Sequence, residues 1–473
     1  MSLKIYNTLT RKKEEFKATQ AGKIKMYVCG ITAYDECHLG HARAAIVFDV
    51  IYRTLKFRYP NDEITYIRNF TDVDDKIIKK SKETGTPWQE ITEKYIRSYQ
   101  EQMTRLNVLS PTQEPRATQH IDEMKSLIQS LISKGLAYPA GNDVYFEVRQ
   151  FKGYGKLSNK KIDELESGAR IEVDEKKKDP LDFALWKGAK PGEPQWPSPW
   201  GAGRPGWHIE CSAMSTKYLG DSFDIHGGGR DLMFPHHENE IAQSEGASGK
   251  QPFSRYWIHN GFVNINAEKM SKSLGNFLTI PNILTHWEPE VVRYFLLSSH
   301  YASPLDFTEQ AMANAQEALI RFYEALLRLK ESQTGSSHYS VDFDRCLIEG
   351  LDDDFNTTVV VGRLFEMVRH INKMLDAKQW ITAADKEAFF QGIKKINEVL
   401  GIFGCEPTAF LNKIRQKGLA LSSEEITSLI AERKTARLTK DWKRSDEIRD
   451  ELLSKGILLK DNPDGSTTWE TQR

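Results

Sequence analysis

The sequence lacks long hydrophobic runs, and it has few cysteines. No apolar segment approaches the ~18 residues that a membrane span requires, and the first residues contain no apolar core of a signal peptide. The five cysteines are odd in number and sparse for a chain of 473 residues, which excludes a disulfide scaffold and favours reduced thiols or metal ligands. We therefore expect a soluble protein of the cytoplasm with no membrane partner.

The chain also lacks an excess of charge of either sign. Lys and Arg together number 65 and Asp and Glu together number 66, so that the formal net charge is -1. A surface that binds nucleic acid would therefore depend on local clusters of basic residues. The length allows several domains, since domains usually contain ~100 to 200 residues.

A strand followed by a helix opens the first predicted domain. Residues 24–31 are apolar and β-prone, apolar residues recur at helical spacing from Ala42, and a second strand candidate covers 64–69. This order predicts a right-handed βαβ unit of a parallel sheet, in which ligands bind beyond the carboxyl ends of the strands. The residues expected to share that pocket are Cys29, Gly30, the turn at 38–41 and Thr71.

Four scattered side chains could converge on one zinc ion. The candidate ligands are Cys29, Cys211, His236 and Glu240. His236 and Glu240 are four residues apart in a predicted helix and so share one face, and the set would supply the two thiolates, one imidazole and one carboxylate of a tetrahedral site. His237 and Glu238 offer rival donors at the same helix start. A solvated, charged first turn is the alternative for the whole segment.

Two motifs indicate a nucleotide site. In the His-Leu-Gly-His turn, Gly40 permits close approach, while His38, His41 and the helix N-terminus can face phosphate oxygens. In the segment Lys-Met-Ser-Lys-Ser, Lys269 and Lys272 can neutralise charge that develops on a leaving pyrophosphate. An exposed polar turn is the alternative for the second motif. Both motifs in this order, separated by a split α/β sheet, favour the nucleotide site.

These motifs resemble the signatures of the cysteinyl-tRNA synthetases, which are class I aminoacyl-tRNA synthetases. The turn at 38–41 is similar to the class signature His-Ile-Gly-His, with Leu39 in place of Ile, and residues 269–273 match the second class signature. The segments more specific to the cysteine enzymes are Tyr-Val-Cys-Gly-Ile-Thr at 27–32, Pro-Gly-Trp-His-Ile-Glu-Cys-Ser at 205–212 and Phe-Pro-His-His-Glu-Asn-Glu at 234–240. The resemblance covers essentially the whole chain.

The resemblance implies an ATP-dependent ligase that joins L-cysteine to the 3′ end of cysteine tRNA through cysteinyl adenylate. The implied cofactors are one zinc ion per chain, which recognises the substrate thiolate, and Mg²⁺ bound with ATP. The implied zinc ligands are Cys29, Cys211, His236 and Glu240. The implied catalytic residues are His38, His41, Lys269 and Lys272. The residues implied to bind ATP are Gly40, Gly229, Asp231 and Lys272, and those implied to bind cysteine are Cys29, Gly30, Thr71, Trp207 and His236.

The predicted fold is α/β, with a Rossmann-type parallel sheet split by a connective insertion and followed by a helical bundle and a small mixed C-terminal domain. The two halves of the catalytic domain are predicted at 1–115 and 223–265, and the insertion, including the return to the sheet, at 116–222. The later units are a signature-loop and stem-contact region at 266–306, a helical bundle at 307–402 and an anticodon-binding domain at 403–473.

The C-terminal tail carries the candidate contacts to tRNA, Arg437 and Trp442. The basic residues Arg433, Arg437, Lys440 and Arg444 recur at intervals of three and four, so they form either an RNA contact or a solvated helical face. The family expectation is a monomer. One rival is a related ligase that joins cysteine to an amino sugar but lacks this tail, and another is a non-catalytic zinc-bearing RNA-binding protein, which the intact catalytic signatures disfavour.

Overall fold

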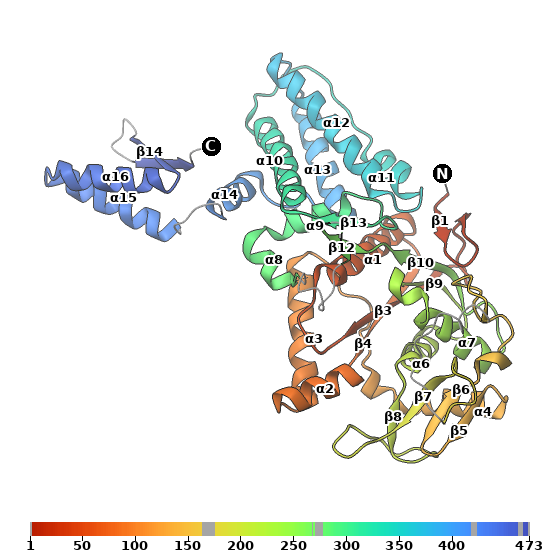
Figure 1. The fold of residues 1–473 in the computed structure, drawn as a ribbon. Helices are drawn as coiled ribbons and strands as arrows, with labels where there is room; N and C mark the ends of the chain where they lie inside the picture. The colour runs from red at the N-terminus through yellow and green to blue at the C-terminus, as the bar shows by residue number, and fades with distance from the viewer. Residues whose placement is uncertain are drawn as a thin grey trace.

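The computed structural model describes residues 2–162, 176–266, 268–269, 278–417, 423–461 and 467–471. The chain forms a parallel sheet with helices, an inserted antiparallel sheet, a helical bundle and a small C-terminal unit (Figure 1). This architecture confirms the predicted fold class, whereas the residue limits of the domains stay predictions. Within the described part of the chain, no helix combines the length and the apolar character of a membrane span.

The central sheet has four parallel strands in the order β10, β9, β3, β4. The strands are β3 (Lys23–Thr32), β4 (Glu63–Thr71), β9 (Phe223–Gly229) and β10 (Ser254–Asn260). Helix α1 (Leu39–Arg58) connects β3 to β4, so the predicted βαβ unit is confirmed. The two strands approach closely at Gly30, where a Cβ atom would lie 1.6 Å from the carbonyl oxygen of Asn69. Any side chain there would force the strands apart.

The segment between β4 and β9 adds helices and a second sheet. The helices are α2 (Asp75–Thr84), α3 (Trp88–Arg105), α4 (Ile121–Ser133) and α6 (Trp207–Leu219). The antiparallel strands, in spatial order, are β5 (Ala137–Ala140), β6 (Asp143–Phe146), β7 (Phe183–Gly188) and β8 (Gly203–Pro205). Helix α6 returns the chain to β3 and β4 and packs beside α7 (His236–Ser248). The insertion thus delivers α6 to the central sheet.

The helical bundle is joined to α1 by a buried cluster of charged groups. Asp49 in α1 accepts a hydrogen bond of 2.9 Å from Arg53 Nε and also pairs with Arg293 of α9 (Pro289–Leu297). Arg293 Nε in turn donates to the carbonyl oxygen of Leu400, 2.8 Å away, at the end of the bundle. The bundle helices are α10 (Glu309–Glu331), α11 (Phe343–Leu351), α12 (Thr357–Asp376) and α13 (Ala383–Leu400). The helix that begins at the nucleotide motif is therefore anchored to the bundle.

Smaller elements complete the chain. An N-terminal hairpin pairs β1 (Lys4–Asn7) with β2 (Lys12–Glu15), and a three-stranded sheet contains β11 (Val263–Ile265), β12 (Glu268–Lys269) and β13 (Leu305–Phe307). Helices α8 (Ile280–His286) and α14 (Pro407–Lys417) lie before and after the bundle. The C-terminal unit consists of α15 (Ser423–Leu438), α16 (Trp442–Ser454), β14 (Ile457–Asp461) and β15 (Thr467–Thr471).

Candidate active site and metal centre

A cavity of about 420 Å³ opens at the carboxyl ends of β3, β9 and β10. Its lining includes eight of the residues predicted for the site, which are Cys29, Gly30, His38, Gly40, His41, Trp207, Gly229 and Asp231. Three further predicted residues, Cys211, His236 and Glu240, are buried and cluster with Cys29. Of the two predicted lysines, Lys269 lies in β12, which pairs with β11, and Lys272 lies outside the described residues.

The His-Leu-Gly-His turn is ordered by its own hydrogen bonds. His38 is the N-cap of α1, and its Nδ1 accepts a hydrogen bond from the Gly40 backbone N–H at 3.0 Å. His41 Nδ1 accepts from the backbone N–H of His38 at 3.3 Å, and the two rings stack with centroids 3.7 Å apart. Because both Nδ1 atoms accept, each neutral ring carries its proton on Nε2. Both imidazoles can therefore donate an N–H to a phosphate oxygen.

Cys29, Cys211, His236 and Glu240 form a compact set of metal-ligand donors. Each contributes one ligand atom, and these atoms all lie within 4.8 Å of one another. Cys29 Sγ is 3.6 Å from Cys211 Sγ and 3.3 Å from Glu240 Oε1, and His236 Nε2 is 3.1 Å from the same oxygen. A tetrahedral zinc ion with bonds of ~2.3 Å to sulfur would place two sulfurs ~3.8 Å apart, so the observed spacing fits this ion.

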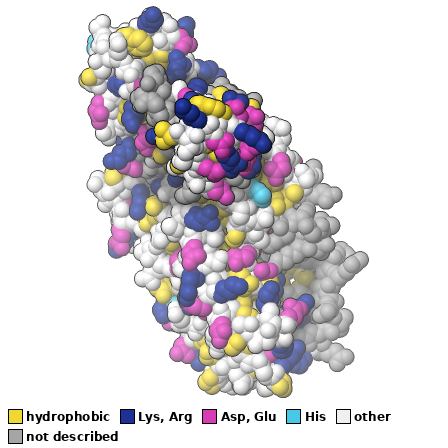
Figure 2. All heavy atoms as spheres, turned by 90° about the vertical axis from the view of Figure 1, so that its left-hand side faces the viewer, with side chains coloured by type: hydrophobic (Ala, Val, Ile, Leu, Met, Phe, Trp, Pro, Cys, Tyr) yellow, Lys and Arg dark blue, Asp and Glu magenta, His cyan; other side chains and the backbone are white. Residues whose placement is uncertain are grey.

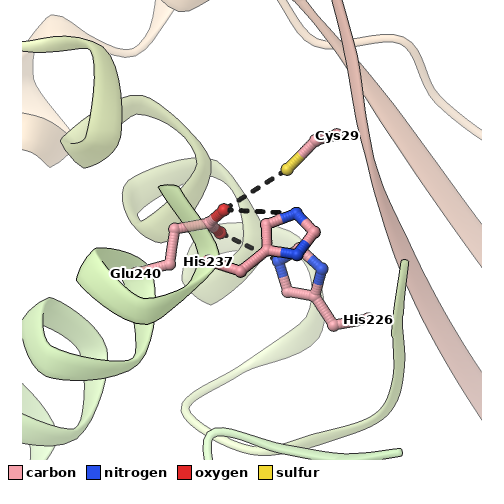
Figure 3. Close-up of side chains that lie close together, drawn as sticks. All are labelled: Cys29, His226, His237 and Glu240. Carbon is pink, nitrogen blue, oxygen red and sulfur yellow. Dashed lines mark hydrogen bonds and ion pairs between the residues drawn. The ribbon is translucent and has the colours of Figure 1, made fainter. Parts of the chain in front are cut away.

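A second set of donors shares Cys29 and Glu240 but adds His226 and His237 (Figure 3). In this set His226 Nε2 is 2.8 Å from Glu240 Oε2, and His237 Nε2 is 4.0 Å from Glu240 Oε1. His237 uses its other nitrogen, Nδ1, in a contact of 2.8 Å with His259 Nε2. Sequence reasoning missed His226, although its place near the carboxyl end of a central strand marks it as a residue of the site.

Glu238, the other rival donor predicted from the sequence, points away from the cluster. Its Oε2 accepts hydrogen bonds of 2.8 Å from both the backbone N–H and the hydroxyl of Ser158 in the inserted segment. The carboxylate is 1 % exposed, so it is held inside the protein by those bonds. Glu238 therefore helps to attach the insertion to α7, and its carboxylate is satisfied without a metal.

The electrostatics of the cluster favour a bound cation. Burial raises the pKa of Cys29, and its hydrogen bond to Cys211 raises it further. Burial also acts to raise the pKa of Cys211, but the hydrogen bonds from Cys29 and His236 outweigh it and lower this pKa to about 6. Burial opposes the charge of Glu240 as well, yet His226 and His236 hold its pKa well below the usual range. Buried negative charge of this kind is stable when a metal or hydrogen-bond donors compensate it.

Trp207 and His208, at the start of α6, pack against His236. The Trp207 ring stacks on the His236 ring with centroids 4.3 Å apart, and the tryptophan lines the cavity and is 38 % exposed. His208 Nδ1 lies 2.9 Å from His236 Nδ1, while Gln243 Nε2 donates to the carbonyl oxygen of His208 at 2.9 Å. These contacts fix the orientation of His236, whose Nε2 faces Glu240.

Thr71, predicted to line the amino-acid pocket, ends β4 but is absent from the described lining of the cavity. It is 3 % exposed, and its hydroxyl donates to Glu210 Oε2 at 2.7 Å. Burial raises the pKa of Glu210 well above its ordinary value. Gly229, which ends β9, and Asp231, which lies in the short helix η3 (Arg230–Met233), both line the cavity. The predicted ribose contacts thus lie where the strand ends.

The C-terminal unit has a small core and an intermixed surface. Its buried apolar residues are Ile426, Ile448, Leu452 and Ile457. Figure 2 looks onto the side from which this unit projects and shows basic and acidic side chains interspersed there. Trp442 is 58 % exposed at the start of α16, while Arg437 Nη1 pairs with Asp461 at 2.9 Å.

The prediction that Arg433, Arg437, Lys440 and Arg444 share one helical face is wrong. Helix α15 ends at Leu438, and Lys440 adopts a left-handed backbone conformation with φ 60° in the turn before α16. Arg444 therefore lies on a different helix, α16, and it pairs with Glu432 of α15. Arg433 is 7 % exposed and forms an ion pair with Asp461, so it stabilises the unit.

Comparisons with known proteins agree along the whole chain. Residues 15–317 match the model of the tRNA synthetases class I (C) catalytic domain, residues 347–404 match the DALR domain, and residues 421–469 match the Cysteinyl-tRNA ligase anticodon binding domain. Cysteine–tRNA ligases of Geobacter metallireducens and Geobacter sulfurreducens are each 52 % identical to this chain, and each alignment covers all of both chains. The corresponding ligase of Thermodesulfovibrio yellowstonii is 51 % identical over 99 % of this chain and all of its own.

Solved structures share the fold at much lower identity. Mycobacterium tuberculosis methionyl-tRNA synthetase in complex with methionyl-adenylate superposes with a TM-score of 0.58 at 16 % identity, covering 83 % of this chain and 94 % of that chain. At this identity the likeness shows the fold alone. The family models and the full-length relatives show more, because they match the catalytic and the C-terminal parts together. The chain belongs to the cysteinyl-tRNA synthetases, a family of class I aminoacyl-tRNA synthetases.

Proposed function

We propose that this cysteine–tRNA ligase works through cysteinyl adenylate and recognises the cysteine thiolate with zinc. The observation that carries the proposal is the position of the four-donor cluster, which shares Cys29 with the cavity that His38 and His41 line. Both reactants of the first step would therefore meet at the end of β3. Monomeric state and cytoplasmic location accompany the proposal as predictions.

The proposed first step needs no protein nucleophile. A carboxylate oxygen of cysteine attacks the α-phosphorus of ATP, a phosphorus–oxygen bond forms, and the bond to pyrophosphate breaks. His38 and His41 would donate hydrogen bonds to the phosphate oxygens, and Lys269 and Lys272 would neutralise the leaving pyrophosphate, whose oxygens also bind Mg²⁺. Catalysis in this scheme comes from positioning and from charge stabilisation.

In the proposed second step, a hydroxyl of the terminal ribose of the tRNA attacks the acyl carbon, and AMP leaves with the phosphate oxygen. Gly229 and Asp231, at the end of β9, would bind the ribose of the adenylate, and Thr71 with Trp207 would hold the amino acid. Glu210 supports this role for Thr71, because it fixes the threonine hydroxyl at 2.7 Å. The same enzyme–adenylate complex thus serves both steps.

Zinc would solve a problem of selectivity. Serine differs from cysteine by one atom, and the shape of a pocket distinguishes such analogues by only ~1 to 3 kcal/mol. Zinc held by Cys29, Cys211, His236 and Glu240 would supply a soft ion that binds a thiolate much better than a serine hydroxyl. Selection at this site would make a separate editing domain unnecessary.

The C-terminal unit would bind the anticodon of cysteine tRNA. Exposed Trp442 can stack on an unstacked base, and Arg437 can contact the RNA beside its ion pair with Asp461. The match of residues 421–469 to an anticodon-binding domain favours tRNA over the amino sugar as acceptor. The additional match of residues 15–317 to a catalytic domain disfavours the non-catalytic RNA-binding protein.

A substitution in the cluster tests the proposal. Cys29→Ser should lower both zinc retention and cysteine affinity, measured by metal analysis and by cysteine-dependent exchange of labelled pyrophosphate into ATP. Cys405→Ser, at a half-buried thiol outside the cluster, is the matched control and should leave both unchanged. A zinc-free Cys29→Ser protein with the cysteine affinity of the unsubstituted enzyme would contradict the role of zinc. When cysteine tRNA is added to the unsubstituted enzyme with cysteine and ATP, the product should be aminoacylated tRNA.

A further inference from the structure

His226 contacts the cluster through Glu240 and is held rigidly by its neighbours. Its Nε2 lies 2.8 Å from Glu240 Oε2, a contact drawn as a dashed line in Figure 3. Both side chains are completely buried. The imidazole stacks on the Trp257 ring with centroids 4.4 Å apart and an interplanar angle of 13°, and the Tyr27 ring lies 5.3 Å away. A side chain packed in this way cannot swing away from Glu240 without disturbing the core.

The two oxygens of Glu240 face different partners. Oε2 is engaged by His226, whereas Oε1 lies 3.3 Å from Cys29 Sγ and 3.1 Å from His236 Nε2, among the other candidate ligand atoms. A hydrogen bond between an imidazole nitrogen and a carboxylate oxygen contains a proton, whichever group carries it. While this bond persists, neither His226 Nε2 nor the bonded lone pair of Oε2 is available to a metal.

The number of ligands that zinc can bind depends on how many oxygens Glu240 contributes. Four protein donors already complete a tetrahedral zinc site, and a substrate sulfur would be a fifth ligand, a number that zinc sites can reach. A carboxylate can bind a metal through one oxygen or through both. If Glu240 used both oxygens, it would take the position that the substrate sulfur needs.

We infer that His226 is a positioning residue that restricts Glu240 to one oxygen toward the metal and so keeps a coordination position open for the substrate thiolate. The inference rests on the zinc function proposed above and deepens it. It assigns His226 no contact with cysteine, ATP or the metal. The role also explains why the second donor set does not need to be a second metal site, because His226 in it is bonded to Glu240.

The test compares three substitutions in the full-length enzyme loaded with cobalt, whose absorption reports sulfur ligands. His226→Phe keeps an aromatic ring for stacking on Trp257 but removes the donor. His226→Gln keeps a donor near the position of Nε2, and His120→Phe removes a buried imidazole that bonds to Arg116 and Tyr218 instead. The measurements are cobalt content, cysteine affinity, KM for ATP, and the increase in the sulfur-to-cobalt band when cysteine is added, above the band that Cys29 and Cys211 give.

His226→Phe should lower cysteine affinity ~10 to 100-fold, the usual cost of losing a partner of a metal ligand, and should weaken the cysteine-dependent band. KM for ATP should stay unchanged, His226→Gln should restore most of the affinity and of the band, and His120→Phe should match the unsubstituted enzyme. If His226→Phe does not retain metal, His226→Asn, whose shorter amide cannot reach Glu240, is measured in its place. Unchanged cysteine affinity and an unchanged band in the variant that lacks the donor would overturn the inference.

The same experiment separates this inference from the proposed function. If cysteine does not strengthen the sulfur-to-cobalt band of the unsubstituted enzyme, the zinc function itself fails. If cysteine strengthens the band there and does so equally in His226→Phe and His226→Asn, only the role of His226 fails. X-ray absorption spectroscopy at the zinc edge adds a direct readout on the zinc-loaded proteins. If Glu240 bound through both oxygens, the number of oxygen neighbours of the metal would increase.

Discussion

The metal cluster and the C-terminal unit place their charged groups in opposite environments. In the cluster, Glu240 and His226 are completely buried, and two thiol groups, an imidazole and a carboxyl group converge within a few ångströms. In the C-terminal unit, Arg437 and Asp461 pair at the surface, with 45 % and 42 % of their side chains exposed. Buried charge of one sign requires a compensating ligand, whereas exposed pairs satisfy each other and contribute little energy. Burial thus indicates the chemistry of the first region, whereas we propose that recognition in the second depends on exposed side chains such as Trp442.

The largest expected effect comes from removing a donor of the cluster. Cys211→Ala should reduce cysteine-dependent pyrophosphate exchange far more than the ~10 to 100-fold cost of losing an outer partner of a metal ligand. It should also release the metal, as measured by elemental analysis. Cys346→Ala is the control, because this thiol is equally buried but belongs to the helical bundle. Full exchange activity in Cys211→Ala would show that the buried cluster is not needed for activation of cysteine.

The next effect concerns the nucleotide motif beside the cluster. His38→Asn keeps a residue that can cap α1 but removes the imidazole donor, so kcat for pyrophosphate exchange should fall ~10² to 10³-fold while the melting temperature is preserved. Pyrophosphate-exchange assays measure kcat, and a thermal melt measures the melting temperature. An unchanged kcat would show that His38 only caps the helix.

A core substitution in the C-terminal unit should separate the two regions functionally. Ile448 is fully buried in a core of four apolar side chains, and Ile448→Ala should cost ~2 to 5 kcal/mol, which a unit this small cannot easily absorb. Aminoacylation of tRNA should therefore fall, while pyrophosphate exchange without tRNA should continue. Equal losses in both assays would show that the regions are energetically coupled.

Trp442→Ala should weaken tRNA binding by ~1 to 3 kcal/mol, the usual value of one base stacked on an aromatic side chain. The side chain is mostly exposed, so the melting temperature should not change. Trp442→Phe, which retains a smaller stacking surface, should recover part of the affinity in an equilibrium binding assay. Undiminished binding in the alanine variant would assign recognition to other residues.

The smallest effect is expected for the surface ion pair. Arg437→Ala should change the free energy of unfolding by no more than ~1 kcal/mol, because Asp461 keeps its second partner, Arg433. Urea denaturation measures this change. A cost above that of Ile448→Ala would mean that the exposed pairs, rather than the small core, stabilise the unit.

The sequence predicted the fold well where local patterns determine it. The apolar strands around 24–31 and 64–69 and the helix between them specify one βαβ unit, and the structure confirms it. The shared face of the four basic residues was wrongly predicted from intervals of three and four. Such spacing indicates one face only within a continuous helix, and Lys440 lies in the turn between α15 and α16.

The candidate site was predictable only in part, for a physical reason. His236 and Glu240 share a helix and could be paired from spacing, but their convergence with Cys29 and Cys211 depends on long-range packing. His226 was missed because the role that we propose for it depends on a single contact across two elements. Lys272 lies outside the described residues, so its role at the triphosphate stays a prediction.

We propose that a metal, rather than the shape of the pocket, selects cysteine. Its most direct test is metal analysis combined with pyrophosphate exchange for cysteine and for serine on the same preparation. We expect one zinc ion per chain and a preference for cysteine well above the ~200-fold limit of shape alone, lost when zinc is removed and regained when it is restored. A zinc-free enzyme that activates cysteine and still rejects serine would contradict it.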